Sequence, residues 1–171
     1  MARILIVGGG CRGRRLAREL LDEGHVLRIT TRSEEQRAAI ESCGAECWIA
    51  TPMRVGTLRP ALDGVTLACW LLAGASGGEE EVHELHGSRL ERFLCQLIDT
   101  PARGFIYDAS PGVLAPELLA EGRRVVRAVT EHNAIPARVL SGLKPGGAGD
   151  ADWLDAARGA VESLLGPRAG G

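Results

Sequence analysis

Hydrophobic residues recur along the chain with two spacings, whose alternation predicts the fold. Short unbroken apolar runs, beginning with Ile4 to Val7, are typical of strands buried on both faces of a parallel sheet. Apolar residues three or four positions apart, as at Leu16 and Leu20, predict amphipathic helices. The predicted strands cover residues 4–7, 26–30, 45–49, 65–73, 105–107 and 137–140. The predicted helices cover residues 12–23, 33–43, 79–98, 116–133 and 152–165, with a short helix between 52 and 64.

This order predicts parallel strands joined by helical crossovers, and therefore a three-layer α/β/α protein with a Rossmann-type doubly wound sheet of about six strands. A single domain is expected over residues 1–166, with a flexible tail at 167–171. Ser33 and Gln36 form a capping-box pattern at the start of the second helix.

A glycine-rich turn follows the first predicted strand and opens the first helix. Gly8, Gly10 and Gly13 fit the pattern G-x-G-x-x-G, with Cys11 and Arg12 between the last two glycines. In a dinucleotide site the first glycine permits a sharp turn, the second lets a pyrophosphate approach the backbone, and the third lets the helix pack closely on the sheet. The N–H groups of the first helical turn then face the phosphates. The alternative is a glycine turn that binds nothing.

The end of the second strand favours NADP(H) over NAD(H). An NAD site usually carries a carboxylate there for the ribose 2′-hydroxyl, whereas an arginine accommodates a 2′-phosphate. This chain has Thr31, Arg32 and Ser33 at that place, and Arg12 is expected to reach the same phosphate. The alternative is that Arg32 is only a solvated surface residue.

The nicotinamide half is expected at the carboxyl ends of the fourth and fifth strands. Leu72, Ala73, Gly74 and Ser110 are the candidates there, and the loop at 74–78 is expected to cover the site.

Composition and charge narrow the class of partner. The 171 residues are 45% hydrophobic and 25% charged, with a net charge of −2, so no general attraction to nucleic acid or an anionic membrane is expected. No apolar run approaches the roughly 20 residues of a membrane span, and no signal-peptide pattern is present. With five cysteines taken as reduced thiols, we expect a cytoplasmic protein.

Three stretches resemble short-chain dehydrogenases/reductases of the extended or atypical kind, the epimerase-like, NAD(P)H-binding branch. They read RILIVGGGCRGRRLARELLDEGHVLRITTRS, LERFLCQLIDTPARGFIYDAS and IPARVLSGLKPG. The resemblance implies an NAD(P)-binding Rossmann fold and possible pairing as a homodimer. Most members have the spacing G-x-x-G-x-x-G, and a minority share the G-x-G-x-x-G of this chain.

The resemblance also implies a Tyr-x-x-x-Lys pair, which this chain lacks. Its one tyrosine, Tyr107, lies within the predicted fifth strand, and its one lysine, Lys144, is too far along the chain to be the partner. Ser110 matches the family's serine and is a weak catalytic candidate, with Asp108 as a further source of protons. The chain also ends soon after the sixth strand, where relatives continue into a substrate-binding region.

Two functions of different class follow. The first is a module that binds or senses NADP(H), and the second is an NADP-dependent oxidoreductase acting on a small carbonyl or sugar-type substrate. The missing catalytic pair favours the first.

Cysteine and histidine residues suggest two further sites. Cys11 beside Arg12 at a helix start has features of a reactive thiol, but a small residue also simply fits there. His83 and His86 are one helical turn apart without enough converging ligands for zinc, so we assign no metal and expect them on the polar face of an exposed helix.

Overall fold

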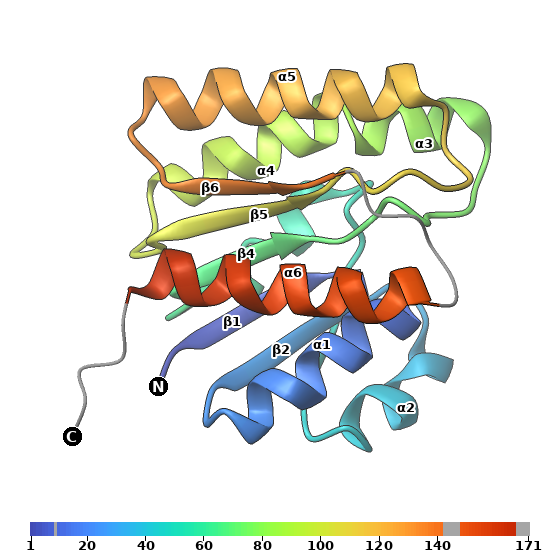
Figure 1. Cartoon of the computed structure of the whole chain (residues 1–171). Helices are drawn as coiled ribbons and strands as arrows, with labels where there is room; N and C mark the ends of the chain where they lie inside the picture. Colours follow the sequence, from blue (N-terminus) through green and yellow to red (C-terminus); the bar gives the residue numbers. More distant parts are fainter. Residues whose placement is uncertain (9, 142–147, 167–171) are drawn as a thin grey trace.

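The computed structural model describes residues 1–8, 10–141 and 148–166. Six strands form one sheet with helices on both faces (Figure 1). The strands are β1 (Arg3–Val7), β2 (Val26–Thr31), β3 (Glu46–Ile49), β4 (Leu67–Trp70), β5 (Gly104–Asp108) and β6 (Ala137–Leu140). The α-helices are α1 (Cys11–Asp22), α2 (Arg37–Glu41), α3 (Glu79–Leu85), α4 (Ser88–Ile98), α5 (Pro116–His132) and α6 (Ala148–Leu165). Three short 3₁₀ helices are η1 (Glu34–Gln36), η2 (Val55–Thr57) and η3 (Pro60–Leu62).

All strand pairs are parallel, in the order β3-β2-β1-β4-β5-β6. The chain builds outward from β1 in one direction and then from β4 in the other, so the order reverses between these two strands. In that register Val7 pairs with Thr30 on one side and with Trp70 on the other. The doubly wound, Rossmann-type sheet expected from the sequence is confirmed.

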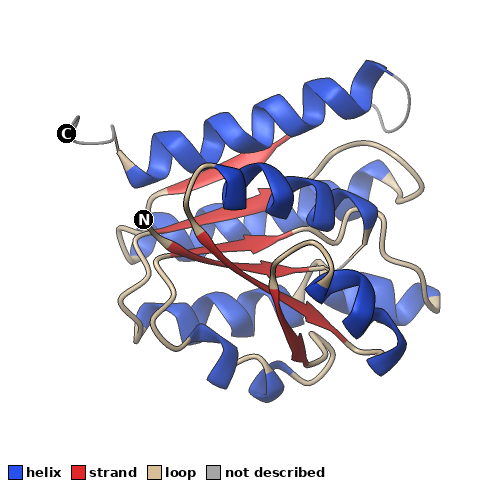
Figure 2. Cartoon of the chain, turned by 90° about the horizontal axis from the view of Figure 1, so that it is seen from below, coloured by secondary structure: helices blue, strands red, loops and turns tan. Residues whose placement is uncertain are grey.

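Alternate residues of each strand enter two separate hydrophobic layers. Leu5 and Val7 face the layer formed with α4 and α5, whereas Ile4 and Ile6 face the layer formed with α1, α2 and α6. Figure 2 shows the twisted strands between these two groups of helices. Strands buried on both faces explain why the sequence has unbroken apolar runs. Within the described part of the chain, no helix has the length and apolar content needed to span a bilayer.

The helix predicted over residues 79–98 is wrong as one element. The chain forms two helices, and α3 ends before His86 while α4 starts at Ser88. Gly87 lies at the junction, and its φ of −124° and ψ of −105° are not helical. The break allows His86 to point into the core, where it is fully buried, so its expected place on an exposed polar face is also wrong.

The predicted capping box at Ser33 is wrong too. Ser33 precedes η1, but its side chain makes no capping hydrogen bond. Instead, its N–H donates to the Thr31 Oγ1 at 3.2 Å, because a local turn competes with the cap. The second helix consequently starts as a 3₁₀ turn, and α2 covers only Arg37–Glu41.

Candidate functional site

A cleft of about 610 Å³ opens at the carboxyl ends of the strands. It lies where the strand order reverses between β1 and β4, the usual ligand position in open α/β sheets. The residues that line it are 8, 10–13, 30–32, 36, 50–53, 71–76, 81, 85, 108 and 110–113. Of the residues proposed from the sequence, all but Ser33 line this cleft.

The three glycines of the turn differ in what surrounds them. Gly8 has φ +122°, and a Cβ there would lie 2.5 Å from the Leu71 carbonyl oxygen. A Cβ on Gly13 would lie 2.3 Å from the Gly8 oxygen, so both positions require glycine for the fold itself. Gly10 has ordinary extended geometry, with φ −69° and ψ −176°, and a Cβ there would meet nothing within 4 Å. The fold leaves that face of Gly10 open toward the cleft.

Helix α1 begins at this open face. The Arg14 N–H donates to the Gly10 oxygen at 3.0 Å, so the helical hydrogen bonds start here. Its first turn contains no acidic side chain, and Gly10 supplies no capping side chain. The first-turn N–H groups and the helix dipole therefore offer a partial positive charge at the cleft.

Arg32, just beyond the end of β2, reaches across the mouth of the cleft. Its guanidinium lies 3.1 Å from Glu81 Oε1 in α3 and donates to the Ser76 oxygen at 3.4 Å. The pair is partly open to solvent, with 58% of the Arg32 side chain and 33% of the Glu81 side chain exposed.

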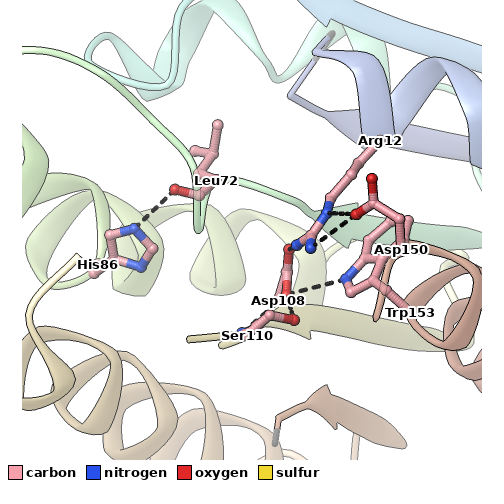
Figure 3. A network of polar contacts seen from close by, with 7 residues as sticks. All are labelled: Arg12, Leu72, His86, Asp108, Ser110, Asp150 and Trp153. Carbon is pink, nitrogen blue, oxygen red and sulfur yellow. Dashed lines mark hydrogen bonds and ion pairs between the residues drawn. The ribbon is translucent and has the colours of Figure 1, made fainter. Parts of the chain in front are cut away.

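Arg12, which the sequence places near the same phosphate as Arg32, contacts α6 and the end of β5. Its Nε and one terminal nitrogen each lie 3.3 Å from Asp150 Oδ1 in α6, and its other terminal nitrogen lies 3.8 Å from Asp108 Oδ2 (Figure 3). The guanidinium also lies over the Trp153 ring, 4.9 Å from its centre. Arg12 thus connects the glycine turn with α6 and with the end of β5. In this arrangement the guanidinium groups of Arg12 and Arg32 have different partners.

Asp108 and Ser110 form a buried polar pair after β5. Asp108 Oδ1 accepts hydrogen bonds from the Ser110 N–H at 3.0 Å, from the Ser110 hydroxyl at 2.5 Å and from Trp153 Nε1 at 3.4 Å (Figure 3). Both residues line the cleft although they are only 2% and 1% exposed. This arrangement holds the serine hydroxyl against a carboxylate at the edge of the cavity.

Tyr107 and His86 form a second buried pair. His86 Nε2 lies 3.1 Å from the Leu72 oxygen, which can only accept, so Nε2 donates and Nδ1 accepts from the Tyr107 hydroxyl at 2.6 Å. Burial is the main cause that lowers the pKa of His86 and raises the pKa of Tyr107. The Tyr107 hydroxyl also lies against Gly122 of α5, where a Cβ would be 1.9 Å away. The only tyrosine of the sequence is therefore packed between His86 and α5.

Sequence reasoning missed one wall of the cleft and the partner of Arg32. Residues 50–53 follow β3, and β3 lies beside β2 in the sheet. The strand order of a doubly wound sheet could therefore have placed these residues at the cleft. Glu81 is 49 residues from Arg32, and nothing local in the sequence links the two. No group of three or more possible metal ligands gathers among the residues that the structure describes.

The comparisons with known proteins support the fold. Vestitone reductase from alfalfa (Medicago sativa) superposes with a TM-score of 0.67 at 14% identity, covering 81% of this chain and 56% of the reductase. A short-chain dehydrogenase/reductase superfamily protein from Agrobacterium tumefaciens with bound NAD gives 0.66 at 18% identity, covering 81% and 48%. UDP-glucose 4-epimerase from Thermotoga maritima gives 0.67 at 12% identity, covering 81% and 54%. The chain thus spans about half the length of these structures.

No protein-family model matches the chain, and no curated protein matches it in sequence. The likeness is therefore one of fold. At that level the resemblance to short-chain dehydrogenases/reductases, including the epimerase-like proteins, is confirmed.

Proposed function

We propose that the protein binds a dinucleotide in this cleft and prefers NADP(H) to NAD(H). The pyrophosphate lies over the turn from Gly8 to Gly13, the adenosine half lies near Thr31 and Arg32, and the nicotinamide half lies near Leu72 to Gly74 and Ser110. The observation that carries the proposal is the open face of Gly10 at the start of α1, which leaves room for a phosphate beside helix N–H groups.

The charge at the end of β2 supports the preference for NADP(H). Thr31 ends the strand and Arg32 follows it, so a cation stands where an NAD site usually has a carboxylate. A guanidinium offers two parallel hydrogen bonds to a phosphate. A 2′-phosphate therefore gains far more from Arg32 than a neutral 2′-hydroxyl does.

We infer that the protein acts as a dinucleotide-binding or sensing module. The packing of Tyr107 against His86 and Gly122 supports this role, because that hydroxyl is not free to transfer a proton to a bound substrate. The alternative is an NADP-dependent oxidoreductase, and the Ser110–Asp108 pair at the edge of the cleft is the observation that favours it.

Isothermal calorimetry with NADP⁺ and NAD⁺ tests the binding proposal. The decisive variant is Gly10→Val, which the free fold accommodates but which places two methyl groups where the pyrophosphate would lie. We expect Gly10→Val to keep the melting temperature and lose at least about tenfold in affinity. The control is Gly56→Val, since Gly56 also has open space around its Cβ position and lies outside the cleft. Equal binding by wild type and Gly10→Val would contradict the proposal.

Turnover separates the two roles. NADPH oxidation is measured with carbonyl, quinone and flavin acceptors, using wild type and Ser110→Ala. Tight binding without turnover supports the sensing module, whereas turnover that Ser110→Ala abolishes supports the oxidoreductase.

A further inference from the structure

Arg32, which would bind the 2′-phosphate, already forms an ion pair with a carboxylate of the same chain. Arg32 lies 3.1 Å from Glu81 Oε1, and both side chains line the cleft. Glu81 belongs to the first turn of α3, which reaches Arg32 from the far side of the loop at 74–78. The carboxylate therefore occupies the place on the guanidinium that a phosphate would take.

We propose that Glu81 is a specificity-determining residue that competes with the 2′-phosphate of NADP(H) for Arg32. The proposal rests on the function proposed above and concerns the same cleft. NADP(H) displaces the Glu81 carboxylate when it binds, whereas NAD(H), which brings only a hydroxyl, leaves the ion pair in place. Glu81 thus lowers the affinity for NADP(H) and links its binding to a movement of the first turn of α3.

Gly77 shows that the loop is shaped to bring Glu81 to this position. Its φ of +157° is one that residues with side chains rarely adopt. A Cβ on Gly77 would lie 2.9 Å from Glu81 Oε2 and 3.2 Å from Glu81 Cδ. Glycine at this position therefore lets the carboxylate lie against the loop as it reaches Arg32, whereas a side chain here would displace it.

The strength of the pair fits a competitor that a ligand can displace. Arg32 is more than half exposed and Glu81 about one third exposed, and such ion pairs are weak because water screens them. A phosphate carries up to two negative charges and binds a guanidinium in bidentate fashion, so it replaces a single carboxylate readily. The neutral hydroxyl of NAD(H) has no charge with which to compete.

The experiment compares Glu81→Gln with Glu80→Gln by calorimetry, using NADP⁺ and NAD⁺. Glu80 is exposed and adjacent, so its variant makes the same change in net charge without touching Arg32. We expect Glu81→Gln to raise the affinity for NADP⁺ about two- to fivefold, the range that an exposed ion pair supplies. Its affinity for NAD⁺ and both affinities of Glu80→Gln are expected to stay within about 1.5-fold of wild type, since screening weakens more distant charges.

Two further variants separate competition for Arg32 from a general effect on the loop. In an Arg32→Ala background, Glu81→Gln is expected to give no gain in NADP⁺ affinity, because the competed cation is gone. Gly77→Ala, which pushes the carboxylate away without changing charge, is expected to raise the NADP⁺ affinity in wild type and to add nothing to Glu81→Gln.

The outcomes distinguish this proposal from the function on which it rests. If NADP⁺ binds wild type but Glu81→Gln behaves like Glu80→Gln, or if the gain persists in the Arg32→Ala background, the competitor role is overturned and the dinucleotide site stands. If neither wild type nor Glu81→Gln binds NADP⁺ at millimolar concentration, the dinucleotide site itself is overturned.

Discussion

The two ends of the cleft are built on different principles. At the glycine turn, backbone groups at the start of α1 face open space, and Gly10 leaves room beside them. At the ends of β4 and β5, Asp108 and Ser110 line the cleft and His86 and Tyr107 lie buried outside its lining, and all four polar side chains find their partners within the protein. One end therefore leaves backbone N–H groups open to the cleft, whereas at the other the polar side chains bond to groups of the protein itself.

Because of this difference, substitutions at the two ends should affect ligand affinity and protein stability separately. A substitution at the open end should change affinity and leave the free energy of unfolding nearly unchanged. A substitution among the buried pairs should do the reverse. Three predictions test the buried end, from the largest expected effect to the smallest.

The largest effect is expected at Gly122 in α5. Gly122→Ala would place a methyl group 1.9 Å from the Tyr107 hydroxyl oxygen and 2.4 Å from the ring carbon that bears it, so the ring or the helix must shift. Overpacking of this kind should lower the free energy of unfolding by about 3 kcal/mol, measured by denaturant titration. Gly159→Ala in α6 is the control, because its Cβ meets nothing within 4 Å and should stabilise the protein by about 0.5–1 kcal/mol. Equal stability of the two variants would show that Tyr107 is not confined.

An intermediate effect is expected from Tyr107→Phe. The change removes the donor to His86 Nδ1 and leaves that buried nitrogen without its 2.6 Å partner. The expected loss of stability is about 1–2 kcal/mol, while the affinity for NADP⁺ should stay within about twofold of wild type. A loss of binding or turnover at unchanged stability would instead place the tyrosine hydroxyl in the functional site and remove the contrast between the two ends.

The smallest effect is a dependence of stability on pH. Burial lowers the pKa of His86 below its ordinary value of 6.5, more than the Leu72 carbonyl and the Asp108 charge raise it. The unfolded chain then binds a proton that the folded protein resists, so the free energy of unfolding should fall as pH drops below about 7 toward the folded pKa. The slope from one group is at most about 1.4 kcal/mol per pH unit.

Replacement of His86 by a neutral residue tests the source of this slope. His86→Gln should show a flatter profile than wild type between pH 5 and 8 in denaturant titrations. His83→Gln is the control, since His83 is exposed on α3 and should leave the profile as in wild type. Parallel profiles for wild type and His86→Gln would assign the pH dependence to other groups.

Local patterns predicted what depends on neighbours in sequence. Apolar runs located all six strands, with β6 at the predicted residues 137–140, and the glycine spacing located the turn at the edge of the cleft. The break between α3 and α4 was missed, although Gly87 marks it and no apolar residue lies between Leu85 and Leu90. The burial of His86 at the break was not predictable from local patterns, because its partners Leu72 and Tyr107 lie 14 and 21 residues away in the chain.

The same limit applies to the candidate site. The spacing along the sequence placed Gly8, Gly10, Gly13 and Arg32 at the cleft, but it carried no information on the side-chain partners of Arg12. Its partners Asp108 and Asp150 come from distant strands and helices that only the folded chain brings together. A homodimer and a cytoplasmic location stay predictions from the sequence.

The hydrogen bond between His86 and Leu72 has a mechanical consequence. It fastens together the two ends of the excursion that carries the loop at 74–78 and helix α3, so residues 73–85 form a flap closed at its base. Trp70 Nε1 in β4 also donates to the Leu85 oxygen at 3.1 Å, so the end of the flap is tied to the sheet as well. These two hydrogen bonds therefore restrain the base of the flap, and neither of them involves the turn that carries Glu81.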